Sequence, residues 1–128
     1  MFSADAQAEK MPCETNYKQE GSFFSGRRFT TWEEVAGVAP DKAFKLVYAD
    51  AVKSGLKIVS TDKEMGAISL EQNQTLNGAQ VSLPWNVLVE ESGGGSKISV
   101  SKMTPSGYAT GQDYQIKSMC AVIETVRK

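Results

Sequence analysis

The residue types that could carry chemistry are few in this chain, and the first to consider is Gly93-Gly94-Gly95-Ser96-Lys97. A phosphate-binding loop of this composition needs the N-terminus of a helix directly after the lysine, where free backbone amides meet the anion. The next residues, Ile98-Ser99-Val100-Ser101, alternate between apolar and polar, which is typical of a strand. The glycine-rich segment is therefore predicted to be the tip of a hairpin.

Carboxylate pairs occur at Glu33-Glu34 and Glu90-Glu91, within predicted strands. Neighbouring residues of a strand point to opposite faces, so neither pair converges on a substrate, and we expect solvated charges. Asp41, Asp62 and Glu64 lack the spacing of a calcium-binding loop. The chain has no histidine, which removes the commonest general base near neutral pH and most zinc ligand sets. We therefore expect no enzyme and no metal or other cofactor.

The charge balance also excludes several classes of partner. Among 128 residues there are 14 basic and 15 acidic side chains, which gives a formal net charge of −1. No field of one sign attracts nucleic acid or an anionic membrane. No stretch is apolar over the roughly 18 residues that a membrane-spanning helix needs. We expect no nucleic-acid binding and no direct membrane insertion.

Four predicted strands between Leu56 and Val100 place their large apolar residues on one face. Two-residue turns at Asn77-Gly78 and Gly93-Gly94 set this register, because a shift by one residue would turn every apolar side chain to solvent. The predicted opposite pairs are Leu70 with Trp85, Ile68 with Val87, Val89 with Ile98, Val87 with Val100, Leu56 with Leu70, and Ile58 with Ile68.

The remaining elements complete the predicted fold. A further strand is expected at Arg28–Val35, and it lies beside either the second or the fifth strand. Ala39-Pro40-Asp41 opens an amphipathic helix that ends at Gly55, and a last helix follows Gly111. The fold class is α+β with two layers, an antiparallel meander with two helices packed on one face, in the order β-α-β-β-β-β-α.

The N-terminal residues differ in composition from the rest. Residues 1–25 are polar and aperiodic, which predicts a flexible leader. Ala6-Gln7-Ala8 has the small-x-small form of a signal-peptidase site, so a remnant of a signal peptide over residues 1–8 is the other interpretation. A single α+β domain is predicted over residues 26–128.

The chain has two cysteines, Cys13 and Cys120. One interpretation is a disulfide bridge that closes a loop of about 108 residues, which a chain-entropy estimate values at roughly 4 to 5 kcal/mol. The other is two unrelated thiols, with Cys120 packed as a small hydrophobe in the last helix. Both interpretations stay open at this stage.

Four residues are candidate contacts for a protein partner. Trp32 has the opposite strand parity from Phe29, so one of these aromatic rings lies outside the core. Leu88 is the one bulky apolar residue on the polar side of its strand. Arg27 and Arg28 precede the first strand and can meet an acidic partner.

A pattern of short motifs runs through the first half of the chain. It consists of Phe44 early in the helix, Gly55-Leu56-Lys57-Ile58 at the strand entry, Asp62 in the turn and Gly66-Ala67-Ile68 at the next strand. With this pattern, residues 29–72 resemble small bacterial cell-envelope domains of lipoprotein-like or unknown function, and more distantly the repeated domains of BamC-type outer-membrane assembly lipoproteins. The lipid-attachment box of such lipoproteins does not precede the first cysteine. The resemblance implies a structural or interaction role in the periplasm or cell envelope and brings no catalytic residues.

We therefore predict a non-catalytic protein-binding or assembly module of the bacterial cell envelope. The alternative is a carrier of a small apolar ligand between the helices and the sheet, with a cavity lined by Phe44, Tyr48, Trp85 and Met119.

Overall fold

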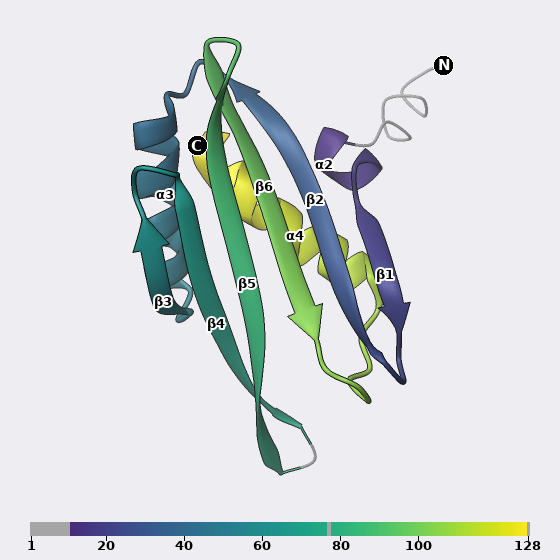
Figure 1. Ribbon diagram of the computed structural model, residues 1–128. Helices are drawn as coiled ribbons and strands as arrows, with labels where there is room; N and C mark the ends of the chain where they lie inside the picture. Colours follow the sequence, from purple (N-terminus) through teal and green to yellow (C-terminus); the bar gives the residue numbers. More distant parts are fainter. Residues whose placement is uncertain (1–10, 77, 128) are drawn as a thin grey trace, which may run out of the picture.

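A six-stranded antiparallel sheet carries the helices on one of its faces in the computed structural model, which describes residues 11–76 and 78–127 (Figure 1). The strands follow the spatial order β1-β2-β6-β5-β4-β3. The helices are α2 (Pro12–Thr15), α3 (Pro40–Lys53) and α4 (Gln112–Arg127), and the strands are β1 (Lys18–Ser22), β2 (Gly26–Ala36), β3 (Lys57–Asp62), β4 (Ala67–Leu76), β5 (Ala79–Ser92) and β6 (Gly95–Thr104).

The register of the three central strands confirms the prediction from apolar alternation. The pairs Leu70 with Trp85, Ile68 with Val87, Val89 with Ile98, and Val87 with Val100 all lie opposite each other. The sequence leaves two positions open for the strand predicted at Arg28–Val35, and this strand, β2, pairs with β6. From β2 to α4 the order β-α-β-β-β-β-α and the two-layer α+β class are confirmed.

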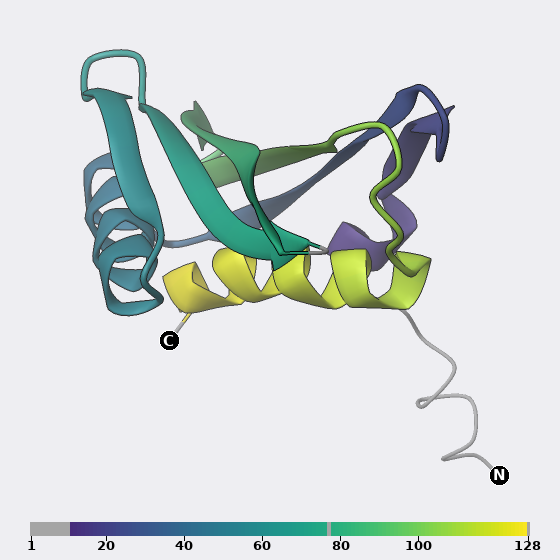
Figure 2. The same cartoon turned by 90° about the horizontal axis from the view of Figure 1, so that it is seen from below.

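The two long helices lie on the same side of the sheet. Figure 2 shows α4 running beneath the sheet and α3 beside it near β3. We call this side the inner face and the opposite side the outer face. α3 begins at Pro40 and ends at Lys53, and Gly55 beyond it has φ +82°, as predicted for its C-terminal cap.

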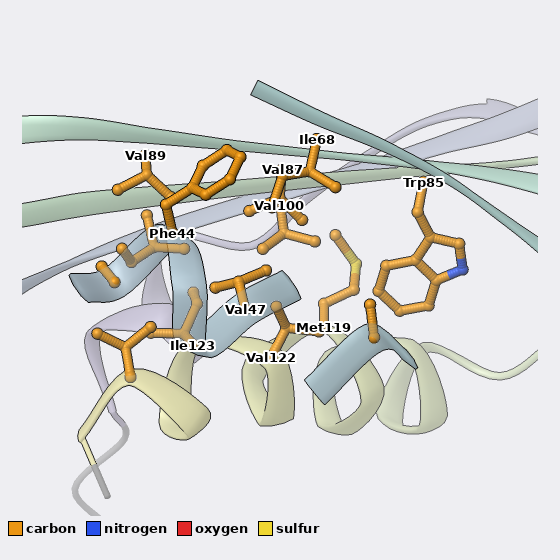
Figure 3. Packing of buried hydrophobic residues seen from close by; sticks show 14 of the residues in the cluster. Phe44, Val47, Ile68, Trp85, Val87, Val89, Val100, Met119, Val122 and Ile123 are labelled. Atoms are coloured by element: carbon orange, nitrogen blue, oxygen red, sulfur yellow. The ribbon is translucent and has the colours of Figure 1, made fainter. Parts of the chain in front are cut away.

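Apolar side chains from the inner face and the two helices form one core (Figure 3). The alternation in β2, β4, β5 and β6 turns every second residue toward the helices, which is why this face is apolar. The buried members of the core are Phe29, Val35, Ile68, Leu70, Trp85, Val87, Val89, Ile98 and Val100 from the sheet, Ala43, Phe44, Val47 and Ala51 from α3, Met119, Val122, Ile123 and Val126 from α4, and Cys13.

The prediction of a flexible leader is wrong for residues 11–25, because they contribute α2 and β1. All five residues of β1 are exposed and polar or glycine, so the strand has no apolar alternation that the sequence could reveal. Backbone pairing with β2 holds it in the sheet. The domain therefore begins before residue 26, while the proposed signal-peptide remnant at residues 1–8 lies outside the described residues.

The predicted register of β3 is also wrong. Ile58 lies opposite Leu70 and Thr61 opposite Ile68, because the turn that follows Asp62 lies further along the chain than the predicted pairs require. A register shift between Ile58 and Ser60 then changes the pairing by one residue. The extra residue is Val59, whose side chain is 53% exposed. A β-bulge of this kind leaves no mark in a period-two pattern.

Candidate functional site

Three of the four candidate partner contacts line one hollow on the outer face. Arg28 and Trp32 of β2 and Leu88 of β5 surround a space of about 290 Å³. Other outer-face residues that line it are Thr30, Ala67, Asn86, Ser99 and Ser101.

The strand register explains why the hollow forms there. Ser99 of β6 lies opposite both Trp32 and Leu88, so the two large side chains flank a small one in a single row across three strands. Ala67 of β4 lies on the far side of Leu88. Because serine and alanine are short, the floor is low between the larger residues.

The neighbouring row of the outer face is polar. Thr30, Ser101, Asn86 and Ser69 follow one another across β2, β6, β5 and β4. The Ser69 hydroxyl donates a hydrogen bond of 2.8 Å to Oδ1 of Asn86. This row offers hydroxyl and amide groups to a bound backbone or side chain.

Trp32 is 39% exposed, whereas Phe29 on the same strand is completely buried. This confirms that one of the two aromatic rings lies outside the core. The Nζ of Lys97 lies 4.7 Å from the centroid of the Trp32 ring, in the range of a cation–π contact. The side-chain amide of Asn16 donates to the Trp32 carbonyl at 2.9 Å. This contact holds the part of β2 that extends past the first residue of β1.

Arg27 and Arg28 do not act together, because adjacent strand residues point to opposite faces. Arg28 is exposed and lines the outer hollow. The Nη1 of Arg27 donates at 3.3 Å to the carbonyl of Thr110, in the connection that leads into α4. Arg27 is therefore not part of the outer hollow.

The two cysteines are joined by a disulfide bond, with their Cα atoms 5.9 Å apart. The bond connects α2 to α4, which resolves the alternatives left by the sequence. It lies beside the largest hollow that we describe, about 480 Å³, whose apolar wall includes Met11, Ile116 and Ala121.

The prediction of a solvated charge is wrong for Glu33, since its side chain is only 1% exposed. It has the same parity as Phe29 and Thr31 and therefore points to the inner face. Its carboxylate pairs with Arg127 and accepts a 3.0 Å hydrogen bond from the backbone N–H of Cys13. The group is a structural tie between β2, α2 and α4.

Lys102 is a second buried charge, and the sequence analysis did not single it out. It is 1% exposed, and its Nζ lies 4.7 Å from the Trp85 ring centroid and 5.5 Å from that of Tyr114. Burial lowers the pKa of Lys102 to about 8. Lys102 lies two residues after Val100 and four after Ile98 on the same strand, so the alternation of side chains could have placed it on the inner face.

The four residues expected to line an apolar ligand cavity do not form one wall. Tyr48 is 40% exposed on α3, whereas Phe44, Trp85 and Met119 are buried. Figure 3 shows Met119 packed between Trp85 and the aliphatic side chains of the core. The geometry therefore does not favour the carrier alternative at this position.

Two general observations complete the description of candidate sites. Within residues 11–76 and 78–127, no three metal-ligating side chains come together in a metal-binding group. None of the helices in these ranges combines the length and the apolar character that crossing a membrane requires.

Comparison with known proteins supports the fold alone. No protein-family model matches the sequence, and no curated protein matches it. Ara h 8.0201 aligns with a TM-score of 0.57 and 17% identity over 80% of this chain and 95% of its own. A conserved protein of unknown function from Enterococcus faecalis aligns with a TM-score of 0.55 and 9% identity over 89% of this chain and 76% of its own.

CalU16 from Micromonospora echinospora aligns with a TM-score of 0.50 and 8% identity over 84% of this chain and 96% of its own. At such identities these likenesses show that the arrangement of the sheet and helices recurs, and they carry no function to this chain. Neither sequence comparison supports the resemblance to BamC-type domains, which stays a prediction.

Proposed function

We propose that this protein is a non-catalytic module that binds a protein partner through the outer hollow around Trp32, Leu88 and Arg28. The observation that carries the proposal is the convergence of these residues, from two strands that are separated by β6, on one depression of the sheet. The sequence alone predicts each of the three as a contact for a protein partner.

The residue types suit an interface. Tryptophan and arginine contribute more binding energy at protein interfaces than other residues, above all next to small pockets. Trp32 keeps 39% of its surface accessible, and Met103, in the next β6 position of the same face as Ser101, is 48% exposed. A partner that covered these side chains would remove apolar surface from water and gain hydrogen bonds from the serine-rich row.

We further propose that the module works in an oxidising compartment, such as the bacterial periplasm or cell envelope. Disulfides persist in exported proteins and are rare in the reducing cytosol. The bond between Cys13 and Cys120 supports this location, together with the sequence resemblance to envelope domains. The absence of histidine from the whole chain supports a non-catalytic role.

Photo-crosslinking from the floor of the hollow tests the docking proposal. A photoreactive amino acid replaces Ser99, which lies between Trp32 and Leu88, and the protein is irradiated in a bacterial envelope extract. We expect one discrete crosslinked partner, which disappears when Trp32→Ala and Leu88→Ser are combined. The control Tyr48→Ala with Val52→Ser removes exposed apolar side chains, 40% and 53% exposed, from α3 and should retain the product.

Two outcomes would contradict the proposal. One is a crosslinking pattern that is the same in the wild type and in the Trp32 and Leu88 variant. The other is loss of the product in the α3 control alone, which would move the binding surface to the helix.

A further inference from the structure

The inner face near the start of α4 holds a buried cation without a counter-ion. Lys102 is 1% exposed, and its Nζ has no hydrogen-bond partner among the described residues. Burial of an ammonium group is costly unless an oxygen ligand or an anion replaces the lost water. The other buried charge of the inner face, Glu33, has its partner in Arg127.

Two aromatic rings replace the water around Lys102 only in part. Trp85 is the nearer ring, and its indole N–H donates at 3.0 Å to Oε1 of Gln72, which fixes the orientation of the ring. Tyr114 is the second ring in contact with Nζ and is 51% exposed. Cation–π contacts are weaker than a charge-assisted hydrogen bond.

Further positive charge surrounds this position. Arg27 lies opposite Thr104, two residues from Lys102, and its guanidinium contacts the Thr110 carbonyl just before α4. The sixteen-residue helix α4 begins at Gln112, so the positive end of its dipole is at the same place. Two cations and a helix N-terminus therefore gather at one end of the inner face.

The surrounding titratable groups do not neutralise these charges. Burial raises the pKa of Tyr17 to about 12 against the opposing effect of Arg27, and burial with Tyr114 raises the pKa of Tyr108, so both tyrosines stay uncharged near neutral pH. Asp113, the acidic residue in the first turn of α4, is exposed, and neither ion pair formed by the described residues includes it. The position keeps a net positive charge.

Unused hydrogen-bonding atoms lie on the same elements. Oγ1 of Thr104 and Oε1 of Gln115 are buried and have no partner among the described residues. The Thr104 hydroxyl can donate to an oxygen anion. The Gln115 side chain is anchored by a 2.7 Å hydrogen bond from Nε2 to the Thr110 hydroxyl.

We propose that this end of the inner face binds the carboxylate of a small amphiphilic ligand, with Lys102 as its counter-ion and Arg27 as a second cation. A carboxylate supplies the single negative charge and the acceptor oxygens that Lys102 lacks, while the half-exposed Tyr114 ring contacts the apolar part of the ligand. Entry requires a rotation of the half-exposed Tyr114 side chain, a motion of picoseconds to nanoseconds for exposed residues. The site is on the opposite face from the docking hollow, so it stands or fails independently of that proposal.

Calorimetric titration with octanoate tests the proposal, and 1-octanol and inorganic phosphate are titrated in parallel. We expect saturable binding of octanoate, with much weaker binding of both other probes, because only octanoate combines the charge with the chain. Lys102→Met should weaken octanoate binding about tenfold or more through loss of a charge-assisted contact, and Arg27→Gln should weaken it less. Lys57→Met, on the exposed edge strand β3, is the matched control and should bind as the wild type does.

A spectroscopic readout identifies the place of binding. The chain has two tryptophans, so Trp32→Phe leaves Trp85 as the sole indole fluorophore. Octanoate should change its emission with the same saturation curve as the calorimetry. Absence of saturable octanoate binding, equal binding of 1-octanol or phosphate, or unchanged affinity in Lys102→Met would each overturn the proposal.

Discussion

The carboxylate of Glu33 pairs with the guanidinium of Arg127, and this contact joins the middle of β2 to the last turn of α4. The acid is 1% exposed and the arginine side chain 30% exposed, so the pair is shielded on the side of the acid. Because Glu33 also accepts the N–H of Cys13, a single buried acid connects α2, β2 and α4.

Removal of the basic partner should leave this acid uncompensated. Arg127→Ala is expected to lower the free energy of unfolding by about 3 kcal/mol, because a buried carboxylate without its cation is strongly unfavourable. Urea unfolding at neutral pH measures the loss. Glu124→Ala is the control, since Glu124 contacts the same arginine but is 42% exposed, and it should cost about 0.5 kcal/mol or less. Equal losses in the two variants would contradict a special role of Glu33.

Reduction of the disulfide should release the N-terminal elements while the rest of the sheet stays folded. Cys13 and Cys120 are 107 residues apart in sequence, and their bond restricts the unfolded chain. Reduction is expected to cost roughly 2–5 kcal/mol. β1 has no buried side chain, so its amides should lose protection from hydrogen exchange in reductant, whereas those of β5 keep it. Unchanged protection of β1 would show that its pairing with β2 suffices.

Gly66 is expected to tolerate no side chain. Its φ is +78°, its carbonyl accepts the Val89 N–H at 2.8 Å, and an added Cβ would lie 2.1 Å from the Val89 carbonyl oxygen. Gly78 has a similar φ of +81° but no atom within 4 Å of an added Cβ. Gly78→Ala should therefore cost only about 1 kcal/mol of backbone strain, and Gly66→Ala should cost clearly more. Equal changes in the thermal midpoint would show that the close approach has no energetic weight.

The sequence predicts the central sheet well because three of its strands alternate strictly and are joined by glycine turns. Leu70, Trp85 and Val87 lie where this alternation places them. β1 could not be found in the same way, since a fully exposed strand is held by its backbone and not by an apolar face. The bulge at Val59 adds a residue without changing composition, so it too escaped the pattern.

The candidate site shows the same limits. The alternation of β2 predicts that Trp32 lies outside the core. Its convergence with Leu88 depends on the pairing of β2 with β6, two strands that are far apart in the sequence, and the sequence does not show this pairing. Glu33 and Lys102 have inward parity, yet charged residues are usually assigned to solvent. Their burial depends on Arg127 for the first and on the Trp85 and Tyr114 rings for the second, contacts that come from distant parts of the chain.

The burial of Lys102 should appear as a pH dependence of stability. Burial lowers the pKa of this amine to about 8 in the folded protein, from 10.5 in its ordinary state. Between these two values the unfolded chain binds more protons than the folded one, so the contribution of Lys102 to stability rises with pH over that interval. Below pH 8 the folded protein carries the full cost of the buried charge, at most about 3 kcal/mol.

Lys102→Met removes this cost, because methionine fills a similar volume without a charge. The variant should therefore unfold at higher urea concentration than the wild type at pH 7, and the difference should shrink as the pH approaches 10.5. Urea unfolding of both proteins at pH 7, 8.5 and 9.5 measures it, with Lys57→Met as the exposed control that shows no such trend. A Lys102→Met variant that is less stable than the wild type at every pH would mean that the lysine is a structural contact and not a charge held at a cost for a ligand.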